Sequence, residues 1–500
     1  MEPLPRLLHL LVLVLLCFSL VQGRTHSRRH RTKHLKQSIA LPPATSAFSA
    51  AAPQGASNET SANCSRATPP PASIPLPPSP SPSPAPAPAH SPVSVVYDVR
   101  AFGAAGDGVA DDTEAFRAAW VSACQDAKPG PVVLVPRGYS FKLQSTIFPG
   151  PCRSSELVLH VDGTMMPPDG PGEWPANNNR RQWLVFYRAN GLRLEGGGLI
   201  DGKGDKWWDL PCKPHKSNGS SSGPCDSPVA LRFFMSSNLT VRGIKVQNSP
   251  QFHFRFDGCR NVTVDSIRIA SPALSPNTDG IHLENSNGVV IRDSHISNGD
   301  DCVSIGAGTA NVDIHNVTCG PGGHGISIGS LGKQGSSAAC VTNVTVRNCV
   351  IRLSDNGVRI KTWQGGVGAV TAVTFAGIRM DDVRNPIIID QYYCLAKSCP
   401  NATSAVRIAG VTYADIRGTY DVRGPPVHLA CSDAVPCTNI TLAGVELLPA
   451  RDYFVMEPFC WNVYGVAPTL TIPPVTAACL TEGMPRAVME FGTDQCYRLS

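Results

Sequence analysis

The chain has 500 residues, more than a typical single domain, but only 16% of them are charged, and 45 are Gly and 45 are Pro. This composition favours short strands with many turns over long helices. The net charge is +5, of which +6 comes from Lys and Arg in residues 24–36, so the rest of the chain sums to −1. The folded part is therefore not basic, and we expect no nucleic-acid partner.

The first predicted element is an export signal at residues 1–23. Arg6 precedes an apolar run from Leu7 to Leu20, and a short segment ending in Gly23 follows. This run is shorter than the roughly 20 residues that a membrane-spanning helix needs, and no later stretch approaches that length. We therefore predict a secreted protein without stable membrane insertion; a retained membrane anchor is the alternative.

Residues 24–93 are predicted to form an arm outside the folded domain. Its first part, residues 24–36, is basic and contains no acid, and residues 42–92 are rich in Ala, Pro and Ser. The second part is typical of an extended polyproline linker. The basic part could hold an anionic surface or polymer, although a solvated disordered arm is the more frequent explanation.

The chain has 18 cysteines, which indicate disulfide bonds in a secreted protein. The close pairs that could each close a small loop are Cys394/Cys399, Cys431/Cys437 and Cys340/Cys349. A zinc site would need CxxC spacing and clustered histidines, which the sequence lacks. Seventeen cysteines remain without Cys17 of the signal, and Cys64 in the arm is our candidate for an unpaired thiol.

The folded domain is predicted to span residues 94–500 and to begin with a short strand and a helix. Asp111, Asp112 and Glu114 precede an amphipathic segment at residues 115–121, which indicates a helix capped by a capping box. We expect this helix to cap one end of a β core, because an open end of a repeating β structure invites aggregation.

One short phrase with apolar residues at alternate positions recurs along the domain. It starts at Asn238, Asn261, Gly288, Asn311, Asn343, Ala372 and Asn439. The first four steps are 23, 27, 23 and 32 residues, and the longer steps indicate loop insertions. Short strands at this period without intervening helices predict an all-β protein, a parallel β-helix. A β-sandwich is the alternative, but it would not explain the repeated phrase.

The sequence contains nine Asn-X-Ser/Thr sequons, which fit a secreted glycoprotein. Three of these asparagines, Asn238, Asn261 and Asn343, occupy the same position of the repeated phrase. They could instead form a stacked ladder whose amides bond from coil to coil. In that case we expect them to be buried and without glycans.

Four polar motifs follow one another at nearly regular intervals. They are Asn277-Thr278-Asp279, Gly299-Asp300-Asp301, Gly323-His324-Gly325 and Arg359-Ile360-Lys361. Asp279 and Asp300 are 21 residues apart, and Asp301 and His324 are 23 apart, about one turn of a β-solenoid. Since adjacent strands lie about 4.8 Å apart, these side chains are expected to converge on one patch.

Each of these residues alone has an ordinary structural explanation. Asn-Thr-Asp-Gly is a turn sequence, Arg-Ile-Lys fits the exposed face of a strand, and a lone histidine is more often structural. Asp300 and Asp301 differ, because two like charges where a strand is expected cost stability unless they are paired or functional. A calcium site is the main alternative, and the accompanying cations argue against it.

Paired carboxylates beside an imidazole and two cations suit the hydrolysis of a glycosidic bond between acidic sugars. One acid protonates the leaving oxygen while a second carboxylate activates water. Arg359 and Lys361 are two residues apart on a strand and therefore share a face, where they would bind a substrate carboxylate.

The four motifs, in this order, resemble the signatures of the polygalacturonases, the pectin-degrading family 28 glycoside hydrolases. Supporting stretches are Gly198–Gly204 before Trp207 and Trp208, Ile326–Gly332 and Asp390–Cys394, and the resemblance covers about residues 95–500. It implies a right-handed parallel β-helix that acts without metal or cofactor and hydrolyses α-1,4-linked homogalacturonan (pectin) with inversion. An extracellular, cell-wall location and a monomeric enzyme are expected.

The resemblance also implies a role for individual residues. Asp300 resembles the general acid, and Asp279 and Asp301 resemble the carboxylates that activate water. His324 would support the acid. The residues expected to bind the substrate are Arg359, Lys361, Tyr393 and Asn277. One departure concerns His324, which follows Cys319 by five residues where the family usually has four, with an additional glycine in the turn.

Three alternatives stay open at this point. A xylogalacturonan or rhamnogalacturonan hydrolase would share the fold, and His324 together with Arg-Ile-Lys argues against the second. A wall-binding glycoprotein would use the arm and carry an inactive β-helix, which the complete motifs disfavour. A lyase of similar architecture would need calcium. The sequence leaves endo or exo action open, and a mildly acidic pH optimum is expected.

Overall fold

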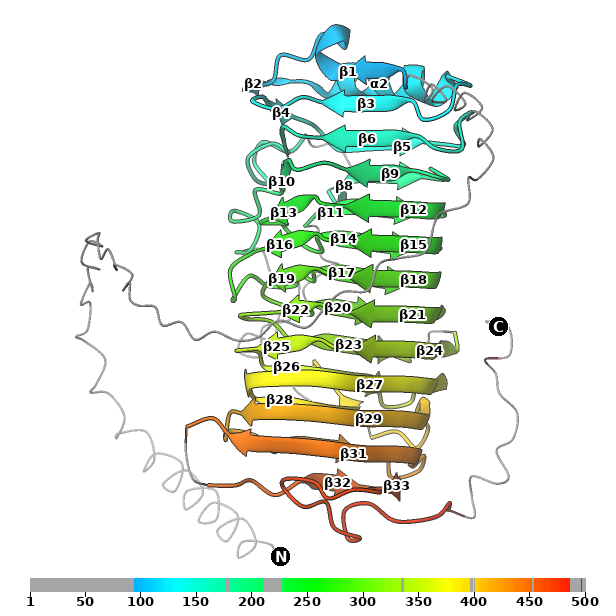
Figure 1. Ribbon diagram of the computed structural model, residues 1–500, viewed down its shortest axis with the longest axis vertical. Coiled ribbons are helices and arrows are strands. Elements are labelled where there is room, and N and C mark those ends of the chain that lie inside the picture. Colours follow the sequence, from blue (N-terminus) through cyan, green and yellow to red (C-terminus); the bar gives the residue numbers. More distant parts are fainter. Residues whose placement is uncertain are drawn as a thin grey trace, which may run out of the picture. The chain divides into compact units, whose positions relative to one another are not determined.

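The computed structural model describes residues 94–175, 180–209, 227–333, 337–395, 399, 401–451, 454–485 and 496. These residues form a parallel β-helix built from two long parallel sheets (Figure 1). The predicted fold class is therefore confirmed. The predicted signal peptide and arm, Cys64 and the sequons before residue 94 lie outside the described residues. Among the described residues, no helix is both long and apolar enough to cross a membrane.

Sheet A has 22 strands and covers two sides of the coil. Its strands are β1 (Val96–Asp98), β2 (Asp107–Asp111), β3 (Val132–Val135), β4 (Ser140–Lys142), β6 (Val158–Val161), β7 (Thr164–Met166), β9 (Arg193–Glu195), β10 (Leu199–Asp201), β12 (Ser237–Arg242), β13 (Lys245–Gln247), β15 (Arg260–Asp265), β16 (Arg268–Ala270), β18 (Asn287–Arg292), β19 (His295–Ser297), β21 (Thr309–His315), β22 (Thr318–Cys319), β24 (Ala339–Arg347), β25 (Val350–Arg352), β27 (Gly368–Val383), β29 (Arg407–Tyr420), β31 (Cys437–Pro449) and β33 (Val463–Val466).

Sheet B has 11 strands, and it is the sheet that carries the polar motifs. Its strands, in spatial order, are β5 (Thr146–Pro149), β8 (Gln182–Tyr187), β11 (Val229–Phe234), β14 (Phe254–Asp257), β17 (Ile281–Glu284), β20 (Val303–Ile305), β23 (Ile326–Leu331), β26 (Asn356–Trp363), β28 (Asn385–Tyr393), β30 (Val427–Ala430) and β32 (Phe459–Trp461). Because this order follows the chain, each rung adds one strand to sheet B.

The repeated phrase forms the core face of sheet A. Its first apolar position stacks from coil to coil, and Leu239 pairs with Val262, which in turn pairs with Val289. The stack continues through Val312 and Val344, and all five side chains are buried. Alternate apolar positions therefore point into the coil, as the period of two in the sequence requires.

The predicted asparagine ladder forms, but it lies on the surface. The side-chain amide of Asn261 donates to Asn238 at 3.1 Å, and Asn343 donates to Asn311 at 2.5 Å. The predicted burial is wrong, because all four side chains are exposed. Their φ angles of 52–57° place them at a left-handed corner of the coil, from which the side chain points outward. At Gly288 the ladder is interrupted.

Helix α2 (Thr113–Gln125), preceded by the 3-10 helix η2 (Val99–Phe102), lies at the N-terminal end of the coil (Figure 1). Its buried Trp120 packs on Phe148, with ring centroids 5.0 Å apart, so the helix caps the core as predicted. The predicted capping box is wrong in detail. Asp112 makes no cap hydrogen bond and accepts from the Ala105 backbone instead, while Asp111 accepts from the Thr113 backbone.

Two of the three predicted disulfides are confirmed, Cys394–Cys399 and Cys431–Cys437. The third is wrong, because Cys340 pairs with Cys496 and Cys349 is a buried free thiol. Cys349 points into the core between β24 and β25, where Cys340 at the far end of β24 does not reach it. Further disulfides join Cys124–Cys152, Cys302–Cys319 and Cys460–Cys479, and Cys259 is a second buried thiol.

Candidate active site

The four motifs meet where the chain enters sheet B on successive rungs. Asp279, Asp301 and His324 each stand two residues before the first residue of β17, β20 and β23. The rungs are joined there by backbone hydrogen bonds from Gly280 to Asp301 and from Cys302 to Gly325, at 2.9 and 2.8 Å. The structure thus brings together residues that the sequence separates by one coil each.

Asp301 is the centre of a buried ion cluster. Its two carboxylate oxygens lie 2.5 Å from Arg359 Nη2 and 2.8 Å from Lys361 Nζ. The side chain is only 3% exposed. Burial alone would raise the pKa of Asp301, but the charges of Lys361 and Arg359 hold it well below the ordinary value. Asp301 is therefore ionised at any pH above the ordinary pKa of an aspartate.

His324 connects the two neighbouring aspartates. Its Nδ1 lies 3.0 Å from Asp300 Oδ1 and 3.6 Å from Asp301 Oδ1. Burial would lower the pKa of His324, but the hydrogen bonds and charges of the two carboxyl groups outweigh it and raise the pKa to about 9. The imidazole is therefore protonated at acidic and neutral pH, and it offsets part of the negative charge of the aspartates.

Two serines that the sequence reasoning missed hold the carboxylates in place. Ser304 Oγ donates to Asp279 Oδ2 at 2.7 Å, and Ser327 Oγ donates to Asp301 Oδ1 at 2.8 Å. In both cases the serine lies one rung beyond the aspartate, on the outward face of sheet B. The signal in the sequence was the matching pair Val303-Ser304-Ile305 and Ile326-Ser327-Ile328, one coil apart.

The turn before Asp300 is fixed to the previous rung. The Asn298 side-chain amide donates to the carbonyl groups of Thr278 and Asp301, both at 2.8 Å. A Cβ atom at Gly299 would lie 2.0 Å from the Ser275 carbonyl oxygen, so only glycine fits there. The Cys302–Cys319 disulfide ties this rung to the segment before His324. Asp300 and Asp301 are thereby held on a rigid frame.

The additional glycine before His324 is absorbed by a tight turn. Gly320, Gly322 and Gly323 have φ angles of 94°, 93° and 69°, which favour glycine. After this turn the His324 backbone N–H donates a hydrogen bond to the Asp300 carbonyl oxygen at 3.0 Å. A separation of five residues from Cys319 to His324 therefore still places the imidazole on Asp300.

Replacing Gly323 with alanine is expected to lower the rate of catalysis at least tenfold. The new Cβ would lie 2.2 Å from the Asp300 carbonyl oxygen, so Asp300 and His324 must separate. Gly138→Ala is the matched control, because Gly138 also has a positive φ, 86°, but no atom lies within 4 Å of its added Cβ. Both variants carry backbone strain, so their melting temperatures are compared first. If Gly323→Ala and Gly138→Ala were equally active at equal melting temperatures, the turn would not position His324.

Of the residues expected to bind substrate, Arg359 and Lys361 belong to the ion cluster, and Tyr393 lies beside it. Arg359 and Lys361 project from the same face of β26, and Lys361 Nζ lies 5.5 Å from the centroid of the Tyr393 ring. Trp363 packs edge-on against Tyr393 at 5.2 Å. Asn277 lies two residues before Asp279 in a left-handed turn with a φ of 57°. The ion pairs of both cations with Asp301 were not foreseen.

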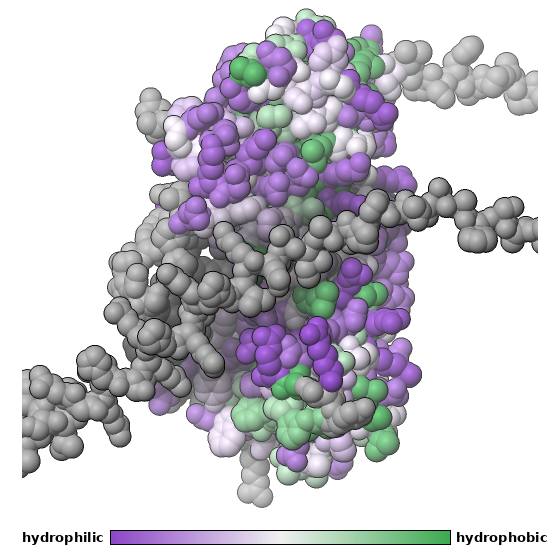
Figure 2. Space-filling view, turned by 90° about the vertical axis from the view of Figure 1, so that its left-hand side faces the viewer, coloured by the Kyte–Doolittle hydropathy of each residue, from purple (hydrophilic) through white to green (hydrophobic). Residues whose placement is uncertain are grey.

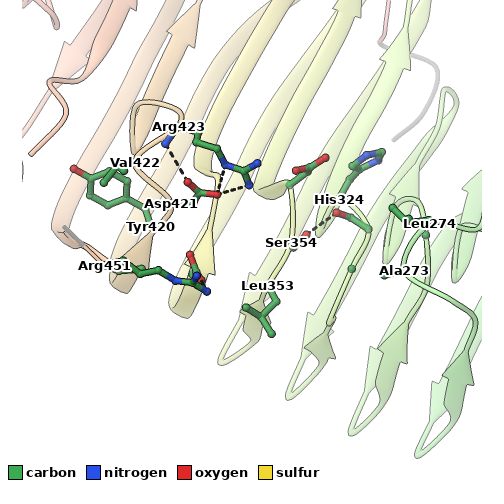
Figure 3. A pocket seen from close by; sticks show the side chains of 16 residues that line it. Ala273, Leu274, His324, Leu353, Ser354, Tyr420, Asp421, Val422, Arg423 and Arg451 are labelled. Atoms are coloured by element: carbon green, nitrogen blue, oxygen red, sulfur yellow. Dashed lines mark hydrogen bonds and ion pairs between the residues drawn. The ribbon is translucent and has the colours of Figure 1, made fainter. Parts of the chain in front are cut away.

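A cavity of about 750 Å³ adjoins the cluster on the side of His324 (Figure 3). It runs past Ser354 to Asp382 in β27 and to the ends of β29 and β31 with the loops that follow them. Arg423 pairs with Asp421, and Arg451 pairs with Asp382 at 3.1 Å. His324 is the one predicted site residue among the described residues that line the cavity. The cavity is within the size range of ligand-binding clefts in proteins.

Comparison with known proteins identifies the family. The model of the family described as "Glycosyl hydrolases family 28" matches residues 124–460 of the chain. The chain belongs to this family. A probable polygalacturonase of Arabidopsis thaliana is 43% identical over 383 residues, which is 76% of this chain and 83% of the relative. Polygalacturonase-2 of Solanum lycopersicum is 42% identical over 371 residues, 74% of this chain and 78% of the relative.

Solved structures agree on the fold. The endo-xylogalacturonan hydrolase of Aspergillus tubingensis superposes with a TM-score of 0.61 at 24% identity, over 78% of this chain and 99% of that structure. An exopolygalacturonase of Thermotoga maritima superposes with a TM-score of 0.60 at 20% identity, over 71% of this chain and 87% of that structure. At this identity the likeness shows a common β-helix and does not decide between substrates.

Proposed function

We propose that this chain is a secreted polygalacturonase that acts as a monomer on homogalacturonan in the cell wall and hydrolyses its α-1,4-galacturonosidic linkages. The observation that carries the proposal is the cluster of Asp300, Asp301 and His324 with two cations on one face of sheet B. Acids supply the chemistry of glycoside cleavage, and the cations suit a sugar that carries a carboxylate. The names of the relatives support the same substrate.

In this proposal Asp300 protonates the glycosidic oxygen of the leaving group. His324, bound to Asp300 Oδ1, keeps that carboxyl group oriented. Asp279 and Asp301, each held by a serine, activate the attacking water from the other side of the sugar. Inversion of the anomeric carbon follows when acid and base act on opposite faces of the ring.

Arg359 and Lys361 have a double role in this proposal. Each makes one charged contact with Asp301, and Arg359 Nε also donates to Ser327 Oγ at 3.0 Å. A guanidinium has five N–H donors and an ammonium has three, so each cation keeps further donors. The remaining donors are available to the carboxylate of a galacturonate beside the Tyr393 ring. Since Asp301 holds both cations, the substrate carboxylate meets a preorganised site rather than two mobile side chains.

The test is the release of reducing ends from polygalacturonate by the purified protein, with ultraviolet absorbance of the products followed in parallel. Hydrolysis is expected to produce reducing ends without unsaturated sugars. A rise in ultraviolet absorbance would indicate a lyase, and faster cleavage of xylogalacturonan than of polygalacturonate would indicate the other substrate. Binding of polygalacturonate without any cleavage would favour the wall-binding alternative.

A chelator is expected to leave the activity unchanged. Asp300, Asp301 and His324 offer ligand atoms within 4.8 Å of one another, so they could in principle hold a metal. These groups fit a metal poorly, because Asp301 is already neutralised by two cations and His324 is protonated up to a pH of about 9. The measurement is the rate with EDTA against the rate with added calcium. Loss of activity with EDTA and its recovery with calcium would refute this prediction.

A further inference from the structure

The outward face of sheet B continues beyond the ion cluster in two rows of side chains. One row runs from Ser304 and Ser327 through Arg359, Ile388 and His428 to Phe459. The other runs from Lys361 through Asp390 and Ala430 to Trp461. Phe459 and Trp461 are three strands beyond the two cations, about 14 Å away. An extended polymer that lies along this face therefore reaches both aromatic residues a few sugar units from the cluster.

The two aromatic rings lie on a groove of about 410 Å³. The side chains that line it are Asp390, Tyr392, His428, Ala430, Asp433, Phe459 and Trp461. Phe459 stacks on His428 with centroids 4.8 Å apart, and Trp461 Nε1 donates to Asp433 Oδ1 at 2.6 Å. Phe459 is nevertheless 45% exposed and Trp461 53% exposed. The rings are thus held in place while their faces are open to a ligand.

Exposed apolar side chains are concentrated at this end of the β-helix. Between residues 454 and 472 the large hydrophobic residues that are exposed are Phe454, Val455, Phe459, Trp461, Val466, Leu470 and Ile472. Figure 2 shows hydrophobic surface at the lower, C-terminal end of the β-helix. Rigid aromatic rings in an open groove are suited to the apolar face of a sugar ring.

The groove differs from the ion cluster in its charge. Two aspartates line it, and among its described lining residues there is no Lys or Arg. Burial raises the pKa of Asp390, although the charges of His428, Arg359 and Lys361 act in the opposite direction. A galacturonate carboxylate placed there would add a second or third anion at close range. A sugar without a charge avoids this cost.

We propose that Phe459, Trp461 and Tyr392 form a distal sugar-binding site that accepts a methyl-esterified galacturonate unit of the same polysaccharide chain. This proposal rests on the proposed function, since the chain must be bound at the ion cluster to run along sheet B. The enzyme would then cleave between charged units while it holds an uncharged unit a few positions away. Partly esterified pectin would be preferred to the fully de-esterified polymer.

The experiment compares kcat/KM of wild type and Trp461→Ala on three substrates, namely long polygalacturonate, a partly methyl-esterified polymer of the same length, and a short de-esterified oligomer. Trp461→Ala is expected to lower kcat/KM about fivefold on the esterified polymer and to leave the short oligomer unchanged. Asp433→Lys is expected to shift the preference severalfold toward the de-esterified polymer. Phe454→Ala, at a phenylalanine that is 67% exposed outside the groove, is the control.

Equal effects of Trp461→Ala and Phe454→Ala on all three substrates would overturn the distal site. The proposed function would still stand in that case, because it depends only on the cleavage of polygalacturonate. A change of sedimentation in Trp461→Ala with unchanged kinetics would assign the groove to a second copy of the chain and overturn the proposal as well. If wild type cleaves no substrate, the proposed function fails, and calorimetry of the esterified oligomer on both proteins decides the distal site. Equal affinities there would also overturn it.

Discussion

Asp300→Asn is expected to lower kcat on polygalacturonate by about 10²–10⁴-fold, with little change in KM. The amide keeps the shape of the carboxyl group and a partner for His324 Nδ1, which lies 3.0 Å from Asp300 Oδ1 in the native protein. It has no acidic proton to give to the leaving oxygen. The loss therefore falls on the chemical step. Initial rates of reducing-end release over a range of substrate concentrations measure it.

The matched control for this variant is Asp293→Asn. Asp293 is exposed at a corner of sheet A and accepts a hydrogen bond from Asn316 at 3.1 Å. Its φ of 52° is one that asparagine adopts readily, so the change removes one charge without strain. Asp293→Asn should retain wild-type activity. If Asp300→Asn also retained it, at an unchanged melting temperature, Asp300 would not be the acid.

Asp301→Ala is expected to abolish activity and to lower the free energy of unfolding by about 3–5 kcal/mol. The reason is the burial of its two partners, since the side chains of Arg359 and Lys361 are 11% and 8% exposed and would lose their counter-charge. Chemical denaturation at neutral pH measures the difference between the proteins. A second variant, Asp301→Ala with Lys361→Met, removes one uncompensated charge and should recover part of the stability.

The pH dependence of this difference has a definite sign. The pKa of Asp301 is lower in the folded protein than its ordinary value of 3.8. Its contribution to stability is therefore fully present above that value and is lost only as the pH falls through the lower folded pKa. Wild type and Asp301→Ala should converge only in strong acid. Convergence near pH 5, or a loss of less than about 1 kcal/mol, would contradict the ion cluster.

The sequence predicted the coil and the rungs because both depend on short-range patterns. The phrase that starts at Asn238 and Asn261 recurs in register, and a strand period of two places its apolar residues in the core. The acids could be predicted for the same reason, since one coil separates Asp279 from Asp301. The extra glycine before His324 departs from the family pattern, and the positive φ angles of its turn show how the chain accommodates it.

Contacts between distant rungs could not be predicted from short-range sequence patterns. Arg359 reaches Asp301 across an intervening strand, and the same strand supplies Ser327 to both residues. The motif Arg-Ile-Lys alone does not indicate that both cations form ion pairs with Asp301. Cys340 was wrongly paired with the nearest cysteine, although its partner Cys496 is 156 residues away. The aromatic residues of β32 lie outside the repeated phrase, so the strand pattern does not indicate them.

The most direct test of the proposed mechanism is the anomeric configuration of the first product. Proton NMR spectra recorded during the cleavage of polygalacturonate, before mutarotation, distinguish the two anomers of the new reducing end. The account predicts β-anomeric galacturonate ends from wild type and no new ends from Asp300→Asn in the same time. Initial release of the α-anomer would contradict inversion, and no cleavage of polygalacturonate by wild type would contradict the proposed function itself.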